Sequence, residues 1–472
     1  MNRKKQIFKY LFFDVLSADI SWTIFYILRK LTFESSKFGY DIPVKFTETY
    51  YLSLVFIPLY WFLLHYFSGY YKDIFRKSRL NELWQTFQVS FFGVIIIFFS
   101  FLLDDEINSY RNYYLSFISL FTLQFVLTYT PRLIITTRTN HKIRKGKLGF
   151  NTIIIGSNEE AVSVYNEIEN QTSAKFGNKF IGYVNVNGNS KNLFGGILKN
   201  LGDIKDLPKR IEEHKVEEVV IAIEPEEHDK IGRIINTLAN CKVIIKAIPD
   251  MYDILTGKVK MNQIYGYPLF QISHELLPAW QENLKQIIDF VVAFLALVIT
   301  LPLNIFLILS IKVTSKGPVI YTHERIGKYG RPFHIYKFRS MYQDAEQDGP
   351  ALSSKTDSRI TPIGRFMRKS RLDEIPNFVN VLKGEMSLVG PRPERQYYID
   401  QIVKKAPHYV HLHKVKPGIT SWGQVKYGYA ESVDQMIERL KYDILYIENM
   451  SLYVDFKILI YTILTIVRGR GV

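Results

Sequence analysis

The sequence predicts a membrane protein with three parts: an α-helical four-span bundle, an α/β Rossmann-like middle domain, and an α-rich C-terminal domain that contains a re-entrant membrane helix. Two observations lead to this fold class. Four apolar runs of spanning length lie within the first 135 residues, and a fifth begins at residue 284. Between them, short β-rich runs alternate with helical stretches, which is the pattern of a parallel sheet.

The composition excludes several classes of protein. Hydrophobic residues make up 47% of the 472 residues, and 60 Lys and Arg outnumber 45 Asp and Glu, for a net charge of +15. The chain is therefore too apolar to be disordered and too charged to be a wholly embedded transporter. Its single cysteine, Cys241, excludes intramolecular disulfides and CxxC zinc sites. Nucleic acid would explain the basic charge but not the five apolar segments, so we expect no nucleic-acid partner.

The first domain, residues 1–140, is expected to cross the membrane four times; a buried soluble bundle is the alternative. The predicted spans are Ile7–Leu28, Tyr50–Phe67, Phe87–Leu103 and Tyr114–Ile135. Asp14 and Asp19 lie inside the first span, where charge is costly. We therefore expect them on a buried face or in a helix–helix contact.

The loop charges predict the orientation of these spans. Cations such as Arg3, Lys72 and Arg138 lie before the first span, after the second and after the fourth, whereas the loop after the third carries Asp104, Asp105 and Glu106. Because positively charged loops stay in the cytoplasm, the N-terminus and everything after Arg138 are expected there.

Residues 148–255 are predicted to form the Rossmann-like domain. The expected strands are Asn151–Ile155, Phe180–Val186, Glu218–Ile223 and Lys242–Ala247, and the expected helices are Glu159–Asn170, Ile204–His214 and Glu226–Asn240. The first turn keeps only Gly156 of the G-x-G-x-x-G pattern and places Glu159 and Glu160 where a pyrophosphate would approach. This favours a structural or regulatory domain over a dinucleotide-binding one.

The segment Leu284–Ile311 is long enough to span a bilayer at about 1.5 Å per helical residue. Its upstream neighbour is expected in the cytoplasm, and basic residues such as Lys312 and Lys316 follow it. Pro302, near the middle, removes a backbone donor and bends the helix. We expect a re-entrant helix that returns to the side it entered; a kinked span and a core helix are the alternatives. The shorter run Leu452–Val467 suits an interfacial helix or a core helix.

The segment that follows Leu284–Ile311 carries candidate phosphate ligands and an acidic pair. Lys337 and Arg339 are expected on one face of a short strand, where two cations suit a diphosphate. Further along, Asp373 and Glu374 are adjacent. Because Pro376 is tolerated only in the first turn of a helix, a helix is predicted to start near Asp373.

At a helix start the dipole keeps a carboxylate ionised and also attracts phosphate, although plain capping is the ordinary reason for such a pair. An ionised Asp373 is a competent nucleophile toward phosphorus, and Glu374 could share a magnesium ion with it. Arg392 lies between Pro391 and Pro393, which would hold it rigid as a bidentate phosphate ligand.

These motifs resemble the bacterial sugar transferase family, the monotopic phosphoglycosyl transferases. The resemblance covers residues 284–472, with a re-entrant helix at 284–311, and rests on Lys337–Met341, Leu372–Pro376, Asn380–Gly384, Met386–Pro393 and Lys416–Thr420. The N-terminal spans and the Rossmann-like domain resemble the long form of the family, the undecaprenyl-phosphate glucose or galactose phosphotransferases. The last 189 residues would then be an α-rich monotopic catalytic domain on the cytoplasmic face of the bacterial inner membrane.

The resemblance implies transfer of a sugar-1-phosphate from a UDP-sugar to undecaprenyl phosphate, with release of UMP, as the first step of exopolysaccharide, capsule or O-antigen synthesis. By motif position, Asp373 would form an aspartyl phospho-sugar intermediate, and Asp373 and Glu374 would bind Mg²⁺. The implied phosphate ligands are Arg392, Lys337, Arg339, Arg365 and Arg368. Inner-membrane lipid is an expected partner, and a homodimer is one expected assembly.

This sequence departs from the family pattern at two places. Leu301-Pro302 replaces the usual Ser-Pro of the re-entrant helix, and Thr420-Ser421 replaces the usual Thr-Gly, so the resemblance assigns no particular sugar. Two other functions remain as alternatives. One is a membrane-anchored nucleotide-binding scaffold for polysaccharide assembly without transfer activity. The other is a Rossmann oxidoreductase or nucleotide-sugar dehydratase fused to an anchor, against which the missing glycines count.

Overall fold

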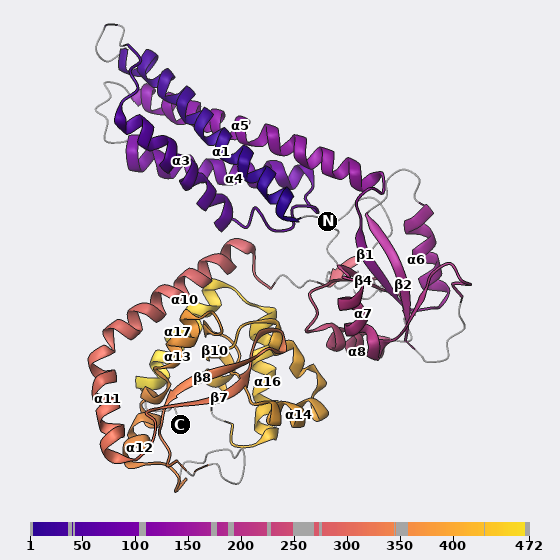
Figure 1. Cartoon of the computed structure of the whole chain (residues 1–472), viewed down its shortest axis with the longest axis vertical. Coiled ribbons are helices and arrows are strands. Elements are labelled where there is room, and N and C mark those ends of the chain that lie inside the picture. Colours follow the sequence, from indigo (N-terminus) through magenta and orange to yellow (C-terminus); the bar gives the residue numbers. More distant parts are fainter. Residues whose placement is uncertain are drawn as a thin grey trace. The chain divides into compact units, whose positions relative to one another are not determined.

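The structure is a computed structural model of the chain. It describes residues 3–35, 40, 43–102, 110–170, 177–186, 193–223, 228–248, 269–272, 276–343, 345, 357–428 and 430–467. The chain divides into two compact units, one formed mainly by Met1–Gly149 and the other by the sheet and helices that follow (Figure 1). The predicted acidic loop Asp104, Asp105 and Glu106 lies outside the described residues.

Four long helices form the first unit. They are α1 (Arg3–Leu28), α3 (Glu48–Phe67), α4 (Arg79–Ile97) and α5 (Tyr110–Arg144), and the π-helical turns Arg29–Glu34 and Phe98–Leu102 extend α1 and α4. Each of the four is long and apolar enough to cross a membrane, and each overlaps one of the four predicted apolar runs. The helices pack through buried residues that include Ala18, Trp61 and Leu120. A Cβ on Gly93 would lie 2.4 Å from the Trp61 ring, so only glycine permits this approach of α3 and α4.

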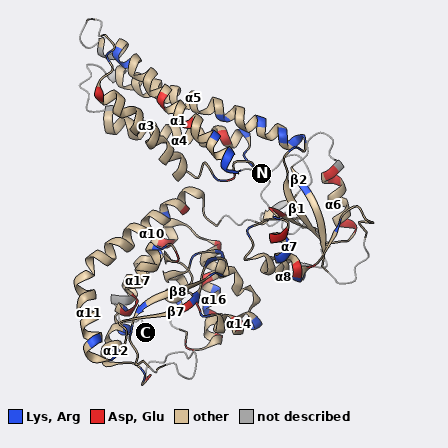
Figure 2. Cartoon of the chain, in the orientation of Figure 1, with Lys and Arg blue, Asp and Glu red and all other residues tan. Residues whose placement is uncertain are grey.

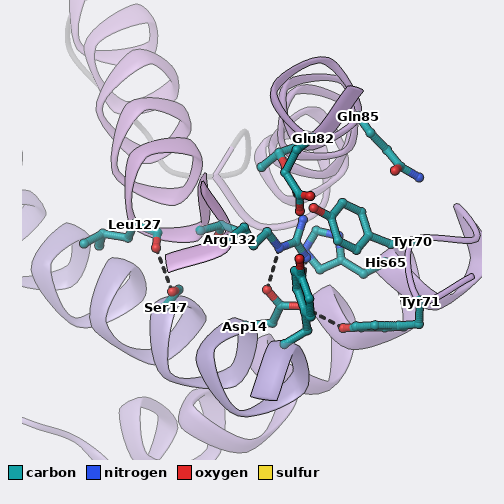
Figure 3. Close-up of polar contacts among 12 residues, drawn as sticks. Asp14, Ser17, His65, Tyr70, Tyr71, Glu82, Gln85, Leu127 and Arg132 are labelled. Carbon is teal, nitrogen blue, oxygen red and sulfur yellow. Dashed lines mark hydrogen bonds and ion pairs between the residues drawn. The ribbon is translucent and has the colours of Figure 1, made fainter. Parts of the chain in front are cut away.

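A buried ion pair joins α1 to α5 within this bundle (Figure 3). Asp14 accepts hydrogen bonds from Nε and Nη2 of Arg132 at 2.7 and 2.8 Å, and the hydroxyl of Tyr71 donates to the same carboxylate at 2.8 Å. The expectation that Asp14 makes a helix–helix contact is therefore confirmed. Asp19 differs, because its buried Oδ1 has no hydrogen-bond partner within the described part of the chain.

The second unit begins with a six-stranded sheet in the order β3-β2-β1-β4-β5-β6. The strands are β1 (Phe150–Ile155), β2 (Asn178–Asn185), β3 (Asn200–Asp203), β4 (Glu218–Ile221), β5 (Ile244–Ala247) and β6 (Phe270–Ile272). All neighbours pair in parallel except β5 and β6. This is the strand order of a doubly wound Rossmann-type sheet, as predicted, with β3 and β6 added.

Helices cover both faces of this sheet (Figure 1). Helix α6 (Glu159–Asn170) packs on one face, and α7 (Leu207–Glu213) and α8 (His228–Leu238) pack on the other. The turn after β1 explains the single glycine of the motif. Gly156 has a φ of 128°, and a Cβ there would lie 2.0 Å from the carbonyl oxygen of Ala222. Close packing against the end of β4 therefore requires this glycine, whether or not the domain binds a ligand.

Two helices that meet at a sharp bend begin the C-terminal domain. Helix α10 (Ala279–Ile299) and helix α11 (Leu301–Thr314) meet at an angle of 61° at Thr300. Pro302 occupies the first turn of α11. Proline has no N–H to continue the hydrogen bonds of α10, so a new helix begins in a new direction. The predicted kink at Pro302 is confirmed.

The polar side of α10 is fixed to the rest of the domain, while its other side is apolar and exposed. Asp289 accepts hydrogen bonds from the Ser387 hydroxyl at 2.7 Å and the Leu388 amide at 3.1 Å, and Lys285 forms a 2.6 Å ion pair with Asp455. The exposed apolar residues of both helices include Phe290, Phe294, Val298, Ile299, Leu301, Ile305, Phe306 and Leu309. Figure 2 shows few charged residues along α10 and α11.

The C-terminal domain packs helices around two small sheets. An antiparallel hairpin consists of β7 (Ile320–Ile326) and β8 (Pro332–Phe338), and a parallel pair consists of β9 (Ser387–Val389) and β10 (Gly418–Thr420). The helices are α12 (Pro362–Lys369), α13 (Asn377–Leu382), α14 (Gln396–Lys405), α15 (Trp422–Lys426), α16 (Val433–Glu448) and α17 (Leu452–Val467). On α17, Ile458 is buried in the core and Phe456 is exposed. This helix therefore has one side in the core and one exposed apolar side, where the sequence suited either a core helix or an interfacial helix.

Candidate active site

The acidic pair lies in a tight turn between α12 and α13. Asp373 and Glu374 belong to the 3-10 turn Leu372–Glu374, and α13 begins only at Asn377. The helix start predicted near Asp373 is thus a 3-10 turn, and the α-helix itself begins later, at Asn377. Arg371 adopts a left-handed conformation with a φ of 58°, which separates α12 from this turn. The Glu374 amide donates to the Arg371 carbonyl at 3.2 Å, so it does not serve a carboxylate.

Side-chain cations, rather than a helix dipole, balance the charge of Glu374. Its Oε1 lies 2.6 Å from Nζ of Lys337, 3.5 Å from Nη2 of Arg392 and 3.8 Å from Nη1 of Arg371. Burial alone would raise the pKa of Glu374, but Lys337, Arg392 and Arg371 outweigh it and hold the pKa well below its usual value. Glu374 is therefore ionised and fixed in place.

Asp373 has a different environment, although it is the neighbouring residue. The residue is only 8% exposed, and its Oδ1 has no hydrogen-bond partner among the described residues. Burial and the charge of Glu374 raise the pKa of Asp373, while Lys337, Arg368 and Arg371 act in the opposite direction. Such a carboxylate keeps one oxygen available and is weakly solvated, which are the properties of a nucleophile.

The structure brings some of the predicted phosphate ligands together and separates others. Lys337, Arg392 and Glu374 line one small cavity with Arg325 and Asn377. The remaining lining residues are Ile335, Met386, Pro393, Gly418 and Ile419. Three cations and a buried acid thus converge on the same space, which suits a substrate that carries phosphate.

The other three predicted cations differ in position. Arg368 donates from Nε to the Ser340 hydroxyl at 2.9 Å, and its charge acts on Asp373. Arg339 instead donates from Nη2 to the carbonyl and hydroxyl of Ser315 at 2.8 Å, just after α11. Arg365 is exposed on α12. Arg368 is therefore near the acidic pair, whereas Arg339 contacts the end of the apolar helix pair.

The loop that carries Arg392 is fixed from both sides. The Gly418 amide donates to the Pro391 carbonyl at 2.9 Å. Glu394 is buried between Arg325 and Arg439, each 2.8 Å from one of its oxygens. Burial alone would raise the pKa of Glu394, yet these two arginines lower it. A fully paired Glu394 thus makes the loop rigid and orients Arg392 toward Glu374.

Sequence reasoning missed four of these residues. Arg371 is two positions before Asp373 in the sequence, and this closeness to the acidic pair could have indicated that it belongs to the site. Asn377 lines the cavity and keeps its buried Oδ1 without a partner within the described residues. Arg325 and Arg439 come from distant segments, and their shared partner Glu394 directly follows the Pro-Arg-Pro motif. The only sequence feature that could have indicated Arg325 and Arg439 is the position of Glu394 directly after the Pro-Arg-Pro motif.

Comparison with known proteins identifies the family. A family model described as "Bacterial sugar transferase" matches residues 280–469, which include the acidic pair and the cavity. An "Uncharacterized sugar transferase" from Haemophilus influenzae is 31% identical over 348 residues, or 70% of this chain and 71% of the relative. The chain belongs to the bacterial sugar transferase family. The resemblance predicted from the motifs is thereby confirmed.

Two other relatives carry more specific names. A "UDP-N-acetylgalactosamine-undecaprenyl-phosphate N-acetylgalactosaminephosphotransferase" from Aeromonas hydrophila is 39% identical over 50% of this chain and 55% of the relative. A "UDP-glucose:undecaprenyl-phosphate glucose-1-phosphate transferase" from Klebsiella pneumoniae is 33% identical over 56% of this chain and 57% of the relative. The chain thus matches little more than half the length of these two relatives. A second family model, described as "CoA-binding domain", matches residues 66–249.

Proposed function

We propose that this family member transfers a sugar-1-phosphate from a UDP-sugar to undecaprenyl phosphate and releases UMP. The product, a polyprenyl diphosphate sugar, would start the assembly of exopolysaccharide, capsule or O-antigen. The relatives from Aeromonas and Klebsiella are named for reactions of this class. The observation that carries the proposal is the pair of unlike carboxylates: Glu374 is held by three cations, and the buried Asp373 beside it keeps an oxygen without a partner.

In the first proposed step, the free carboxylate oxygen of Asp373 attacks the sugar-bearing phosphorus of the UDP-sugar. An O–P bond forms at Asp373, the bond to the oxygen that bridges the two phosphates breaks, and UMP leaves with the electron pair of that bond. Lys337 and Arg392, which line the cavity, would hold the negative charge of the diphosphate. Glu374 keeps these cations in position, because each lies within 3.5 Å of its Oε1.

In the second proposed step, a phosphate oxygen of undecaprenyl phosphate attacks the same phosphorus. The bond to Asp373 breaks, its carboxylate is regenerated, and the lipid diphosphate sugar is released. Two displacements at one phosphorus allow the water-soluble donor and the lipid acceptor to use the same site in turn.

Magnesium fits the acidic pair through Asp373 rather than Glu374. Mg²⁺ in phosphoryl-transfer sites is bound by one or two carboxylates, substrate phosphates and water. Asp373 has two carboxylate oxygens, so one could contact the ion while Oδ1 attacks phosphorus, whereas Glu374 is already engaged by Lys337 at 2.6 Å. A bound ion would neutralise diphosphate charge. We expect chelation with EDTA to abolish UMP release and added Mg²⁺ to restore it.

The arrangement in the membrane is also proposed. The four long helices would cross the inner membrane, and the bent pair α10–α11 would enter from the cytoplasm and return, so that its exposed apolar residues contact lipid while Lys285 and Asp289 stay with the catalytic domain. A cysteine placed at Lys316 in a Cys241→Ser background tests this. We expect labelling only after the cells are permeabilised; labelling from outside intact cells would contradict the proposal.

The reaction itself is tested by measuring UMP release from the full chain in detergent with a panel of UDP-sugars and undecaprenyl phosphate. We expect release with at least one sugar, and a sugar-phosphate adduct on Asp373 when the lipid is left out and the protein is analysed by mass spectrometry. Asp373→Asn is the matched control without adduct. No UMP release from any sugar would favour the scaffold alternative, and turnover that persists in Asp373→Asn would replace the two-step mechanism with direct transfer.

A further inference from the structure

One face of the β7–β8 hairpin supplies three of the residues that line the cavity and continues beyond them. In the antiparallel register, Tyr321 is opposite Lys337 and His323 is opposite Ile335. Residues directly opposite each other in such a pair point to the same face, with Cβ atoms about 5 Å apart. Since Lys337, Ile335 and Arg325 line the cavity, Tyr321 and His323 lie on the face that continues it.

His323 is held in one tautomer by its neighbour on the strand. Nε of Arg325 donates to Nε2 of His323 at 2.7 Å, so Nε2 is the acceptor and the ring proton is on Nδ1. Burial, followed by the charges of Arg325, Arg395, Lys337 and Arg392, lowers the pKa of His323 to about 2. The ring is therefore neutral at physiological pH and presents one N–H donor. This Nδ1 is buried and has no partner within the described part of the chain.

Tyr321 places an aromatic surface beside this donor. Its ring centroid is 5.2 Å from that of His323, and the two planes are inclined by 34°. Nη2 of Arg395 donates to the Tyr321 hydroxyl at 3.1 Å. The residue is 36% exposed, so part of it remains accessible. Two adjacent rings, one buried donor and a cationic neighbour thus form a surface that leads directly to Lys337.

We propose that Tyr321 and His323 bind the uracil ring of the nucleotide sugar. The inference rests on the proposed function and assigns the nucleoside end of its donor substrate. A flat heteroaromatic base stacks on a tyrosine ring, and its carbonyl oxygens accept from an N–H such as Nδ1 of His323. The short distance between Tyr321 and Lys337 across the hairpin matches a nucleotide, in which the base and the phosphates are joined through one ribose.

Inhibition of lipid diphosphate sugar formation by two probes, UMP and inorganic diphosphate, tests the assignment. Tyr321→Ala removes the ring, and base stacking lost to alanine weakens binding by roughly 5- to 150-fold. We expect the KM for the UDP-sugar and the inhibition constant for UMP to rise by at least about 10-fold, with inhibition by diphosphate unchanged. Tyr321→Phe keeps the ring and should stay near wild type. Thr322→Ala, on the opposite face of β7, is the matched control.

His323 supplies a second readout. His323→Gln retains a neutral N–H donor and should keep most of the affinity for UMP, whereas His323→Leu should lose it, with no change in the pH profile of either variant. If wild-type enzyme releases UMP but Tyr321→Ala and His323→Leu bind UMP as tightly as wild type, the assignment is wrong while the proposed function stands. If the wild type releases no UMP from any UDP-sugar, the proposed function itself fails.

Discussion

Asp14 in the helical bundle and Asp373 in the C-terminal domain are both buried aspartates beside arginine, yet their contacts differ. Both oxygens of Asp14 accept from Arg132, and Tyr71 adds a third hydrogen bond (Figure 3). Oδ1 of Asp373 has no partner among the described residues, and Lys337, whose charge acts on Asp373, is bonded to Glu374 instead. The first aspartate is satisfied and the second is not.

The comparison separates a structural carboxylate from the one that we propose as the nucleophile. A buried charge is costly unless it is paired, so the paired Asp14 joins two helices without a large penalty. Asp373 is incompletely paired, and its raised pKa shows that its charged form is destabilised. In the proposed mechanism this destabilisation would be relieved when the carboxylate bonds to phosphorus, so incomplete pairing suits a nucleophile.

The largest expected effect separates the two aspartates directly. Asp373→Asn keeps the size of the side chain but removes the nucleophilic charge, so turnover should fall by about 1,000-fold or more while thermal stability is kept or raised. Asp14→Asn should instead lower thermal stability and leave turnover largely unchanged, because it leaves Arg132 buried without its counter-ion. UMP release and thermal unfolding of both variants in detergent measure the difference. If the two variants lose turnover equally, the proposed difference in role between Asp14 and Asp373 is wrong.

A second substitution measures what the bundle pair contributes to stability. Arg132→Met leaves Asp14 buried and unpaired, which should cost roughly 3–5 kcal/mol of folding free energy. The double variant Asp14→Leu with Arg132→Met removes both charges and should recover much of this loss. Denaturation of the detergent-solubilised chain provides the measurement. If the single variant is as stable as wild type, the pair is not the structural contact that its geometry indicates.

Much of the fold could be predicted from sequence because its signals are local. A long apolar run such as that of α3 is a helix in a bilayer whatever its neighbours are. The proline kink at Pro302 is equally local. Strands β3 and β6 were missed, because Asn200–Asp203 and Phe270–Ile272 are too short to show periodicity and become strands only by pairing with an existing sheet. Ion pairs across helices, such as that of Asp14, depend on packing that no local pattern records.

The residues of the candidate site could be predicted from the sequence, but much of their arrangement could not. The motifs identified Asp373, Glu374 and Arg392, and the structure brings these together with Lys337. They could not indicate that Arg339 contacts Ser315 instead, because β8 ends at Phe338 and Arg339 lies beyond the strand that carries Lys337. Nor could they show the left-handed Arg371, which separates α12 from the 3-10 turn that carries the acidic pair.

The smallest expected effect concerns the pH dependence of the unsatisfied aspartate. The proposed attack on phosphorus requires the ionised form of Asp373, whose pKa is raised by burial and by the charge of Glu374. Activity should therefore be lost as the pH falls through this raised pKa, at a higher pH than for an ordinary aspartate. The acid limb of the kcat/KM profile for UMP release measures it.

Lys337→Gln should move this acid limb to still higher pH. Lys337 is among the cations that lower the pKa of Asp373, and its removal also weakens the hold on Glu374, so the charged form of Asp373 loses stabilisation. Each profile is compared with its own plateau, because the variant will also turn over more slowly. Lys383→Gln, an exposed lysine that bonds Tyr336, is the matched control and should leave the limb in place. An acid limb that stays fixed in Lys337→Gln would mean that another group, and not Asp373, controls the reaction at low pH.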